Sequence, residues 1–485
     1  MSNLKNKKIM KAIKYVFIGA LMLSISTPVM AQQDNKSIID NISIAIKENP
    51  AAAEAKVKEV VKQNKKNVEV LCGIGRAYLD IKDTEKARQY ADMAMKVKGG
   101  AQNALPHILL GDIYVVNDDG GNASMEYEQA IHFDKTNPEP YRKYAQINSK
   151  VSPASSAAKL EELRQVLPNY PVDVINATIY MRANNLTKAL EYYDKVEKNS
   201  MESSDIVNYS LCGFLKGQFE KSREIAEFGA SKFPRHPALN RLVFFNSTNL
   251  KDYSKALEYA DRLFTKSDSA KISASDYLYY GHAYNGSKNY DKAIEMFRKC
   301  IEVDPNAKAD VADAMKNISN AYEEKGDYNN AIIEYKNYLS ELDKQSSTDL
   351  NGLASLYRNW GSTLTGAEQA AKFNLAQQAY DDMLAKFPGD ADIASFVYFM
   401  KARLDGQLDP ETKDFRALNN YQKLAEIIEP MAEKDAAAKN RLIEAYRYLG
   451  YYNLVKNNKA QSDSYWKKIL EIDPNNQAAK DALGM

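Results

Sequence analysis

The chain has few of the residues that break helices or cross-link a fold. Its 485 residues include 21 Gly, 15 Pro and only 3 Cys, whereas an average protein has roughly 7% Gly and 5% Pro. This composition excludes a collagen-like chain and a disulfide scaffold, and it favours helices over a β-rich fold. An aromatic content of 10% also argues against disorder.

Long hydrophobic runs are missing as well, which excludes a protein with several membrane spans. The main apolar run, residues 15–25, is shorter than the about 20 residues that cross a bilayer. Five Lys and no acidic residue precede this run, and Ala31 follows it in the position of a cleavage site. We therefore expect a signal peptide over residues 1–31 and a soluble protein in the bacterial periplasm. Retention of the segment as an N-terminal anchor stays open.

The charge balance has no excess of one sign. Without residues 1–31 the chain keeps 60 basic and 64 acidic residues, a net charge of −4. A slightly acidic chain without a basic block is a poor candidate for binding nucleic acid or an anionic membrane. The Lys-rich stretch over residues 56–66 is flanked or interrupted by Glu54, Glu59 and Glu69. We interpret it as a solvated helix face.

A pattern of about 34 residues repeats along the chain. Counted from Ala274, the large, small and proline residues that define the pattern occupy places 4, 7, 8, 11, 17, 20, 24, 27 and 32. In this unit they are Tyr277, Tyr280, Gly281, Tyr284, Tyr290, Ala293, Phe297, Cys300 and Pro305. The next unit repeats the pattern with Met315, Ile318, Ser319, Tyr322, Tyr328, Ala331 and Tyr335. Places 4, 7, 8 and 11 share one face of a first helix, called helix A, and Pro at place 32 ends a second helix, helix B. Small residues at places 8 and 20 predict close helix packing, with the aromatic at place 24 filling space against the following unit.

This spacing resembles the tetratricopeptide repeat (TPR) family. The resemblance implies an all-α fold: a right-handed superhelical solenoid of about twelve antiparallel helix pairs, with helices A along its inner wall. We expect an N-terminal capping helix pair over residues 32–67 and a regular TPR array over 68–345. Stretched or irregular repeat-like units should follow over 346–430, and a C-terminal unit with its cap over 431–485.

The sequence contains no recognisable set of catalytic or metal-binding residues. Cys72, Cys212 and Cys300 lie in separate repeats, so we expect three buried thiols without a disulfide. The four His lack HExxH spacing, residues 117–122 do not fit a calcium loop, and no nucleophile, base and orienting group can be assembled. We therefore expect a protein that is not an enzyme and that holds no metal and no cofactor.

The inner wall is the predicted binding surface, because places 2, 5, 9 and 12 of helix A point into the groove. Up to the seventh unit these places are mainly apolar: Ile108, Val115, Val174, Met181, Val207, Leu211, Phe214 and Phe245. From the eighth unit onward they are polar or cationic: His282, Asn285, Lys316, Asn320, Arg358, Ser362 and Arg447. This change predicts an extended or helical peptide of mixed character as the ligand. Alternatively, the apolar wall residues only thicken the core.

Some TPR domains hold a C-terminal carboxylate with Lys, Asn and basic residues on three successive helices A. Lys316, Asn320 and Asn359 match three of these positions, but Ala391 and Ser395 stand where two cations belong. The incomplete set weakens the case for carboxylate capture.

These observations predict a non-catalytic interaction scaffold of the periplasm that holds an envelope protein, or a peptide segment of one, in its groove. Two alternatives stay open: an accessory factor of envelope assembly or secretion, and a catalytic or carbohydrate-handling protein that carries TPR repeats. Nucleic acid is not an expected partner, and no membrane span is expected after signal removal. The partner's identity and the oligomeric state are not determined by the sequence.

Overall fold

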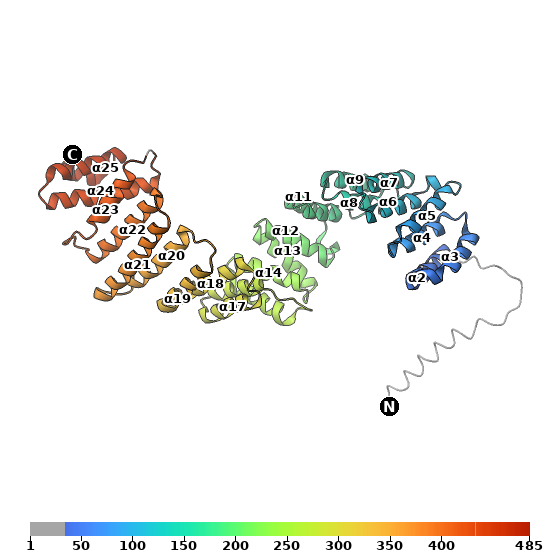
Figure 1. The fold of residues 1–485 in the computed structure, drawn as a ribbon, viewed down its shortest axis with the longest axis horizontal. Helices are drawn as coiled ribbons and strands as arrows, with labels where there is room; N and C mark the ends of the chain where they lie inside the picture. Colours follow the sequence, from blue (N-terminus) through green and yellow to red (C-terminus); the bar gives the residue numbers. More distant parts are fainter. Residues whose placement is uncertain (1–33, 432) are drawn as a thin grey trace, which may run out of the picture. The chain divides into compact units, whose positions relative to one another are not determined.

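The protein consists of paired α-helices in a computed structural model that describes residues 34–431 and 433–485 (Figure 1). The predicted signal peptide, residues 1–31, lies outside the described residues. The chain divides between Glu197 and Lys198 into two compact units, which are treated separately below. The repeat pattern gave no sign of this division.

Within residues 34–197, the first unit contains five helix pairs, in which the first helix is helix A and the second is helix B. They are α2 (Asn35–Glu48) with α3 (Pro50–Asn64), α4 (Val68–Asp80) with α5 (Thr84–Lys96), α6 (Ala104–Val116) with α7 (Gly120–Phe133), α8 (Pro138–Asn148) with α9 (Pro153–Val166), and α10 (Val172–Arg182) with α11 (Leu186–Tyr193). A short 3₁₀ turn, η1 (Gly100–Gln102), precedes α6.

The second unit begins with a short 3₁₀ turn, η2 (Lys198–Ser200), and contains seven pairs and a final helix. The pairs are α12 (Ser203–Leu215) with α13 (Phe219–Lys232), α14 (Pro237–Asn249) with α15 (Tyr253–Asp261) and its π-helical extension η3 (Arg262–Lys266), α16 (Ala274–Gly286) with α17 (Tyr290–Val303), α18 (Lys308–Glu324) with α19 (Tyr328–Glu341), α20 (Ser347–Ser362) with α21 (Gly366–Lys386), α22 (Ala391–Leu408) with α23 (Leu418–Ile428), and α24 (Ala436–Val455) with α25 (Lys459–Ile472). Helix α26 (Gln477–Leu483) follows. The predicted all-α architecture of about twelve antiparallel pairs is confirmed.

One kind of turn joins helix A to helix B in most pairs. A single residue adopts the left-handed conformation, and the next residue begins helix B as its N-cap. In α16–α17, Lys288 has φ +61° and the side chain of Asn289 accepts a hydrogen bond from the backbone N–H of Lys292. In α18–α19, Gly326 takes the left-handed place without the steric penalty of a side chain. Because the turn recurs, the chain reverses direction between helix A and helix B in the same way in most pairs.

The core between the helices depends on the small residues that the repeat pattern predicted. Ala293 and Phe297 on α17 are fully buried, and Phe297 shares a core with Ala314 and Ile318 of the following pair, as predicted. The ring of Phe297 also lies directly beneath Gly281 of its own pair. A methyl group on Gly281 would lie only 2.5 Å from Phe297 Cδ1. Gly281 therefore permits the close approach of α16 and α17.

The three cysteines are buried and free, as predicted. Burial raises the pKa of Cys72 to about 12, that of Cys212 to about 11 and that of Cys300 to about 12. Thiols with pKa values this high remain protonated near neutral pH and are poor nucleophiles. The cysteines are therefore packing residues.

The loop between α22 and α23, residues 409–417, is the longest connection between the two helices of a pair in the second unit. Asp409 is buried, and its carboxylate accepts hydrogen bonds from the backbone N–H groups of Lys413, Asp414 and Arg416. A single carboxylate thus orders this loop. Over residues 34–431 and 433–485, no helix combines the length and apolar character that crossing a bilayer requires.

Candidate functional site

A row of aromatic side chains crosses successive helices A of the second unit. These helices contact one another, α12 with α14, α14 with α16, and α16 with α18. Phe245 on α14 stacks on Tyr279 of α16, with ring centroids 3.8 Å apart and planes 10° apart. Phe214 on α12 lies 6.2 Å from Phe245 on one side, and His282 lies 6.4 Å from Tyr279 on the other. We call Phe214, Phe245, Tyr279 and His282 the aromatic row.

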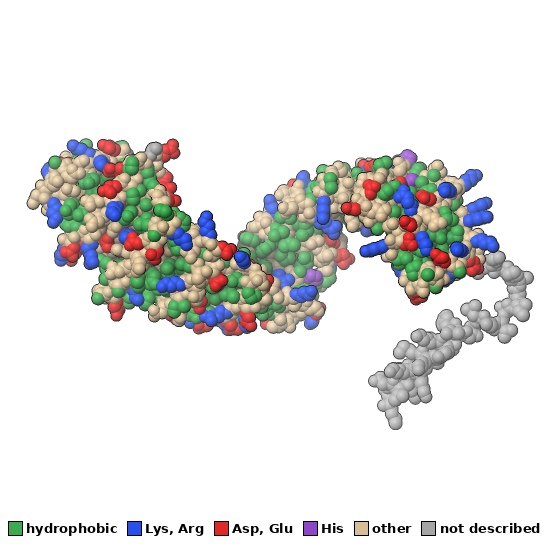
Figure 2. Space-filling view, viewed as in Figure 1, with side chains coloured by type: hydrophobic (Ala, Val, Ile, Leu, Met, Phe, Trp, Pro, Cys, Tyr) green, Lys and Arg blue, Asp and Glu red, His purple; other side chains and the backbone are tan. Residues whose placement is uncertain are grey.

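The side chains of the aromatic row are half-buried. Each therefore retains surface that a ligand could cover, unlike the fully buried core residue Phe297. Figure 2 shows hydrophobic side chains gathered over α12–α14 on the visible face of the second unit. Tyr279 was not among the predicted wall residues, because it stands at place 6, which the groove rule of places 2, 5, 9 and 12 omits.

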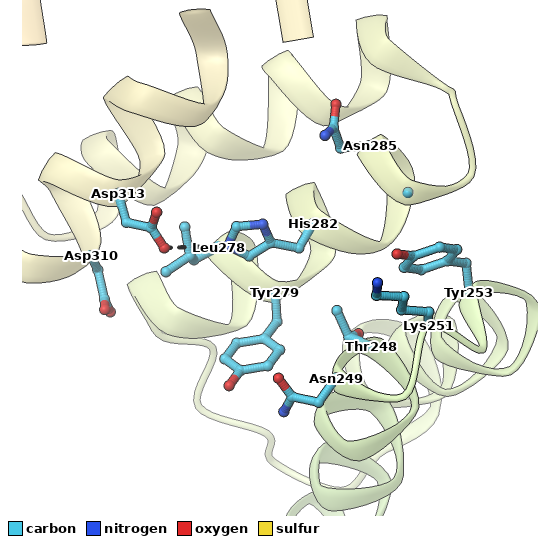
Figure 3. A pocket seen from close by; sticks show the side chains of 11 residues that line it. Thr248, Asn249, Lys251, Tyr253, Leu278, Tyr279, His282, Asn285, Asp310 and Asp313 are labelled. Atoms are coloured by element: carbon cyan, nitrogen blue, oxygen red, sulfur yellow. Dashed lines mark hydrogen bonds and ion pairs between the residues drawn. The ribbon is translucent and has the colours of Figure 1, made fainter. Parts of the chain in front are cut away.

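An open pocket of about 590 Å³ adjoins the row (Figure 3). Its walls come from the end of α14, the start of α15, and helices α16 and α18. The lining residues are Thr248, Asn249, Lys251, Tyr253, Leu278, Tyr279, His282, Asn285, Gly286, Asp310 and Asp313. The pocket thus brings together an aromatic surface, two carboxylates and one lysine.

Two carboxylates from α18 form the acidic side of this pocket. His282 Nε2 lies 3.3 Å from Asp313 Oδ2, and Asn317 Nδ2 donates to Asp313 Oδ1 at 2.7 Å. The hydrogen bond with His282 lowers the pKa of Asp313, against a smaller opposing effect of burial. Asp310 accepts a hydrogen bond from the Ser275 hydroxyl at 2.5 Å. Both carboxylates are therefore held in place next to the aromatic row.

The sequence offered a partial signal for these carboxylates. Asp313 stands at place 2 of its repeat, a groove position, although it was not among the predicted site residues. Asp310 lies before the repeat begins, because α18 starts at Lys308 and is one turn longer than the preceding helix A. The extension of α18 could not be read from the repeat spacing.

Asn285 lies on the opposite wall of the pocket with an unused hydrogen-bond acceptor. Its Oδ1 atom is buried and accepts no hydrogen bond from any described residue. A buried acceptor without a partner costs about 1–3 kcal/mol. A ligand could donate an N–H to this atom only after the Asn285 side chain turns toward the pocket.

All ten residues proposed from the sequence as partner-binding are half-buried. They are Val174, Met181, Val207, Leu211, Phe214, Phe245, His282, Lys316, Asn320 and Arg358. The aromatic row contains three of them, Phe214, Phe245 and His282. Val174 and Met181 lie on α10 in the first unit, so they are not assigned to this site.

One expectation about the wall was wrong. Ile108, expected to face the groove, is only 2% exposed and belongs to the core. The wall of the first unit also carries a charged network that was not among the predicted wall residues. Asp112 on α6 receives hydrogen bonds from Lys143 Nζ at 2.8 Å and from the Tyr127 hydroxyl at 2.6 Å, and it also pairs with Arg76. This network joins the four helices α4, α6, α7 and α8, and its charged groups are paired with one another.

Two cations of the predicted polar half, Lys316 and Arg358, lie close to polar or acidic neighbours. Lys316 lies close enough to Asp313 and Asp349 to contribute to the lowered pKa of each carboxyl, although it is not the main cause of either shift. Arg358 donates to Asn359 Oδ1 at 3.3 Å, and Asn359 Nδ2 donates to Glu323 Oε1 at 2.8 Å. Because a carboxylate already occupies Asn359, the structure gives no support to the carboxylate-capture set.

The described residues offer no site for a metal ion. Outside residues 1–33 and 432, no group of three or more His, Cys, Asp or Glu side chains lies close enough together to hold one. The pocket also contains no Ser, Cys or Lys paired with a base in the manner of an activated nucleophile.

Comparisons with known proteins identify the repeat directly in part of the chain. Residues 277–307 and 312–340 match the tetratricopeptide repeat family. No curated protein matches the chain with significant similarity.

Several solved structures of helical-repeat proteins are similar to the chain. The C-terminal part of a TPR repeat-containing protein from Cytophaga hutchinsonii is 23% identical, with a TM-score of 0.45, and the match covers 57% of this chain and 100% of that one. A tetratricopeptide repeat protein from Parabacteroides merdae is 18% identical, with a TM-score of 0.33 and coverage of 51% and 97%. Pseudomonas aeruginosa PilF is 15% identical, with a TM-score of 0.29 and coverage of 50% and 93%. These similarities carry no information about what this chain binds.

The family match coincides with α16–α19, the part of the second unit that carries Tyr279, His282 and Asp313. Helix pairs of the same design lie on both sides of it along the chain. Residues 277–307 and 312–340 therefore match tetratricopeptide repeats, and they lie within an array of helix pairs that continues on both sides of them.

Proposed function

We propose that the protein is a non-catalytic scaffold of the bacterial periplasm that holds a peptide segment of an envelope protein against the inner wall of its second unit. TPR repeats typically mediate protein–protein interaction, and the export signal read from the sequence supports the compartment. The aromatic row is the observation that carries the proposal, because it joins partly exposed rings from three successive helices A into one surface.

The chemistry of the row and pocket favours a particular kind of peptide. An aliphatic or aromatic side chain would cover the stacked rings of Phe245 and Tyr279, since burial of apolar area drives such contacts. A neighbouring Lys or Arg would meet the carboxylates of Asp310 and Asp313. These carboxylates add acidic groups to a wall that the sequence predicts to be polar and partly cationic from the eighth unit onward.

The unused acceptor of Asn285 supports a peptide rather than a purely apolar ligand. A peptide main chain presents an N–H at nearly every residue, and one such group would supply the missing hydrogen bond to Asn285 Oδ1 once that side chain turns toward the pocket. The pocket alone is too open to enclose a small substrate, so most of the ligand's contacts would come from the row.

The proposal is tested with a photo-crosslinking residue in place of Phe214 in living cells. We expect it to capture a defined envelope protein, and we expect Phe245→Asp to reduce capture at least about tenfold because a charge then faces the apolar segment. Asp313→Asn should weaken capture less, since it removes one charge at the edge of the surface. Circular dichroism melting of both variants should stay close to that of the parent.

The matched control is the same crosslinker in place of Glu295, which is exposed on helix B α17. Capture of the same proteins at Glu295 and Phe214 would contradict the proposal, because binding would then not be confined to the wall. Capture that survives Phe245→Asp would also contradict it. Turnover of a carbohydrate or other substrate by the pure protein would favour the catalytic alternative.

A further inference from the structure

The first unit has a cationic pocket far along the chain from the aromatic row. Four exposed lysines, Lys65, Lys66, Lys96 and Lys98, surround a pocket of about 690 Å³. Lys65 and Lys66 directly follow the last residue of α3, and Lys96 ends α5. Figure 2 shows Lys and Arg side chains projecting beside these helices.

Repeat stacking creates this cluster. The two pairs of lysines are about one repeat apart in sequence, at equivalent ends of two successive helices B, so packing of the two repeats places them side by side. Neither pair forms a basic block by itself, and residues 56–66 contain acidic neighbours. For this reason the sequence predicted only a solvated helix face.

The four lysines carry more positive charge than the nearby negative groups neutralise. The C-terminus of each helix has about half a negative charge, so α3 and α5 together account for about one of the four positive charges. No ion pair with any described residue engages these four side chains, whereas Lys86 of the same unit pairs with Glu54 at 3.0 Å. About three positive charges are therefore left without a partner at this pocket.

The floor of the pocket is apolar. Met93 and Val97 line it and are half-buried. A ligand that satisfies both parts must combine several negative charges with a short apolar portion. Lysine ammonium groups bind phosphate as point charges, and the apolar residues beside them match the apolar part of a lipid, which an acidic peptide rich in carboxylates does not offer.

We propose that this pocket binds the phosphate-bearing headgroup of an anionic lipid, with Met93 and Val97 against the adjoining apolar part. The first unit would thereby attach the protein reversibly to a membrane surface. Each lysine near an anionic surface strengthens binding about fivefold, which corresponds to about 1 kcal/mol. The attachment is independent of peptide binding by the second unit.

The test uses co-sedimentation of residues 32–485 with vesicles of phosphatidylcholine, with or without roughly 30% phosphatidylglycerol. We expect binding only to the anionic vesicles, and a strong loss between about 50 mM and about 300 mM NaCl as screening increases. Lys96→Gln/Lys98→Gln should weaken binding about 25-fold, from two factors of about five. The charge-matched control Lys36→Gln/Lys58→Gln removes two exposed lysines outside the pocket and should retain binding within about twofold.

Three results would overturn the proposal. The first is equal loss in the pocket and control variants, which would indicate general electrostatic attraction. The second is that glycerol phosphate binds as tightly in solution as the anionic vesicles do, which would assign the pocket to a small phosphate. The third is that polyglutamate binds the protein as tightly as the anionic vesicles do and displaces them, which would assign the pocket to an acidic polymer. Circular dichroism confirms that each variant is folded, and a variant that unfolds is replaced by the single substitution Lys98→Gln.

Discussion

The contact between Gly281 and Phe297 gives the sharpest test of the repeat packing. A Cβ atom at position 281 would lie 2.5 Å from Phe297 Cδ1, well inside the separation of two carbon atoms in contact. Phe297 is fully buried and cannot rotate away into solvent. Gly281→Ala should therefore force α16 and α17 apart.

The expected free-energy changes follow from this geometry. Overpacking by Gly281→Ala should destabilise the local fold by about 1–3 kcal/mol. Phe297→Ala should cost about 3–5 kcal/mol, because it removes a buried ring and leaves a cavity. In the double variant the new methyl group enters the space left by the ring. The double variant should then be more stable than the sum of the single effects by about 1–2 kcal/mol.

Amide hydrogen exchange read by mass spectrometry is the suitable assay, because a stacked array opens locally and a single melting temperature averages over its repeats. Exchange through local opening should accelerate about tenfold for every 1.4 kcal/mol of lost stability in peptides from α16 and α17. Peptides from α24 and α25, several repeats away, serve as an internal control and should change little. Strict additivity of the two substitutions, or protection that Gly281→Ala leaves unchanged, would refute the packing described here.

Other predictions concern buried charges. Burial is the largest single influence on His107 and opposes its charged form, but the hydrogen bonds to Glu126 at 2.7 Å and to the Ala101 carbonyl, together with the charge of Glu126, outweigh it, so the pKa of His107 is raised. The stability that protonated His107 contributes should be complete below the ordinary histidine pKa of about 6.5 and should be lost as the pH rises through the raised pKa. His107→Gln should remove this pH dependence from thermal melting of the first unit. Arg241 bonds the fully buried carboxylate of Asp276 at 2.6 Å, so Arg241→Leu should cost about 3–5 kcal/mol in urea unfolding by leaving that charge unpaired. The matched Arg235→Leu breaks an exposed pair and should cost under about 1 kcal/mol, and equal effects of the two would contradict the assignment.

The repeat register and its core could be predicted from the sequence because they depend on local spacing. Gly281, Ala293 and Phe297 recur at places that a helix pair must use for close packing, so their burial follows from helical geometry alone. The burial of the three cysteines follows from the same register. The error at Ile108 has the same origin, since a shift of one place along a helix rotates a side chain from wall to core by about 100°.

The candidate site could be predicted only in part. The sequence selected Phe214, Phe245 and His282 as wall residues, but not the ring of Tyr279 that joins them. It predicted a partly cationic wall, where Arg358 contacts Asn359, and it did not select the carboxylates of Asp310 and Asp313. Side chains from different repeats meet according to the offset and rotation between repeats, and the repeat pattern does not encode either quantity.

By itself, then, the amino-acid order determined that this protein consists of stacked helix pairs with tight Gly, Ala and aromatic interiors, because each pair is specified within about 34 residues. Only the tertiary structure decided that Phe245 stacks on Tyr279, that Asp313 meets His282, and that lysines at the ends of α3 and α5 form one pocket. These contacts join residues about one repeat apart. They exist because neighbouring repeats bury their apolar faces against each other and thereby bring their exposed side chains into register.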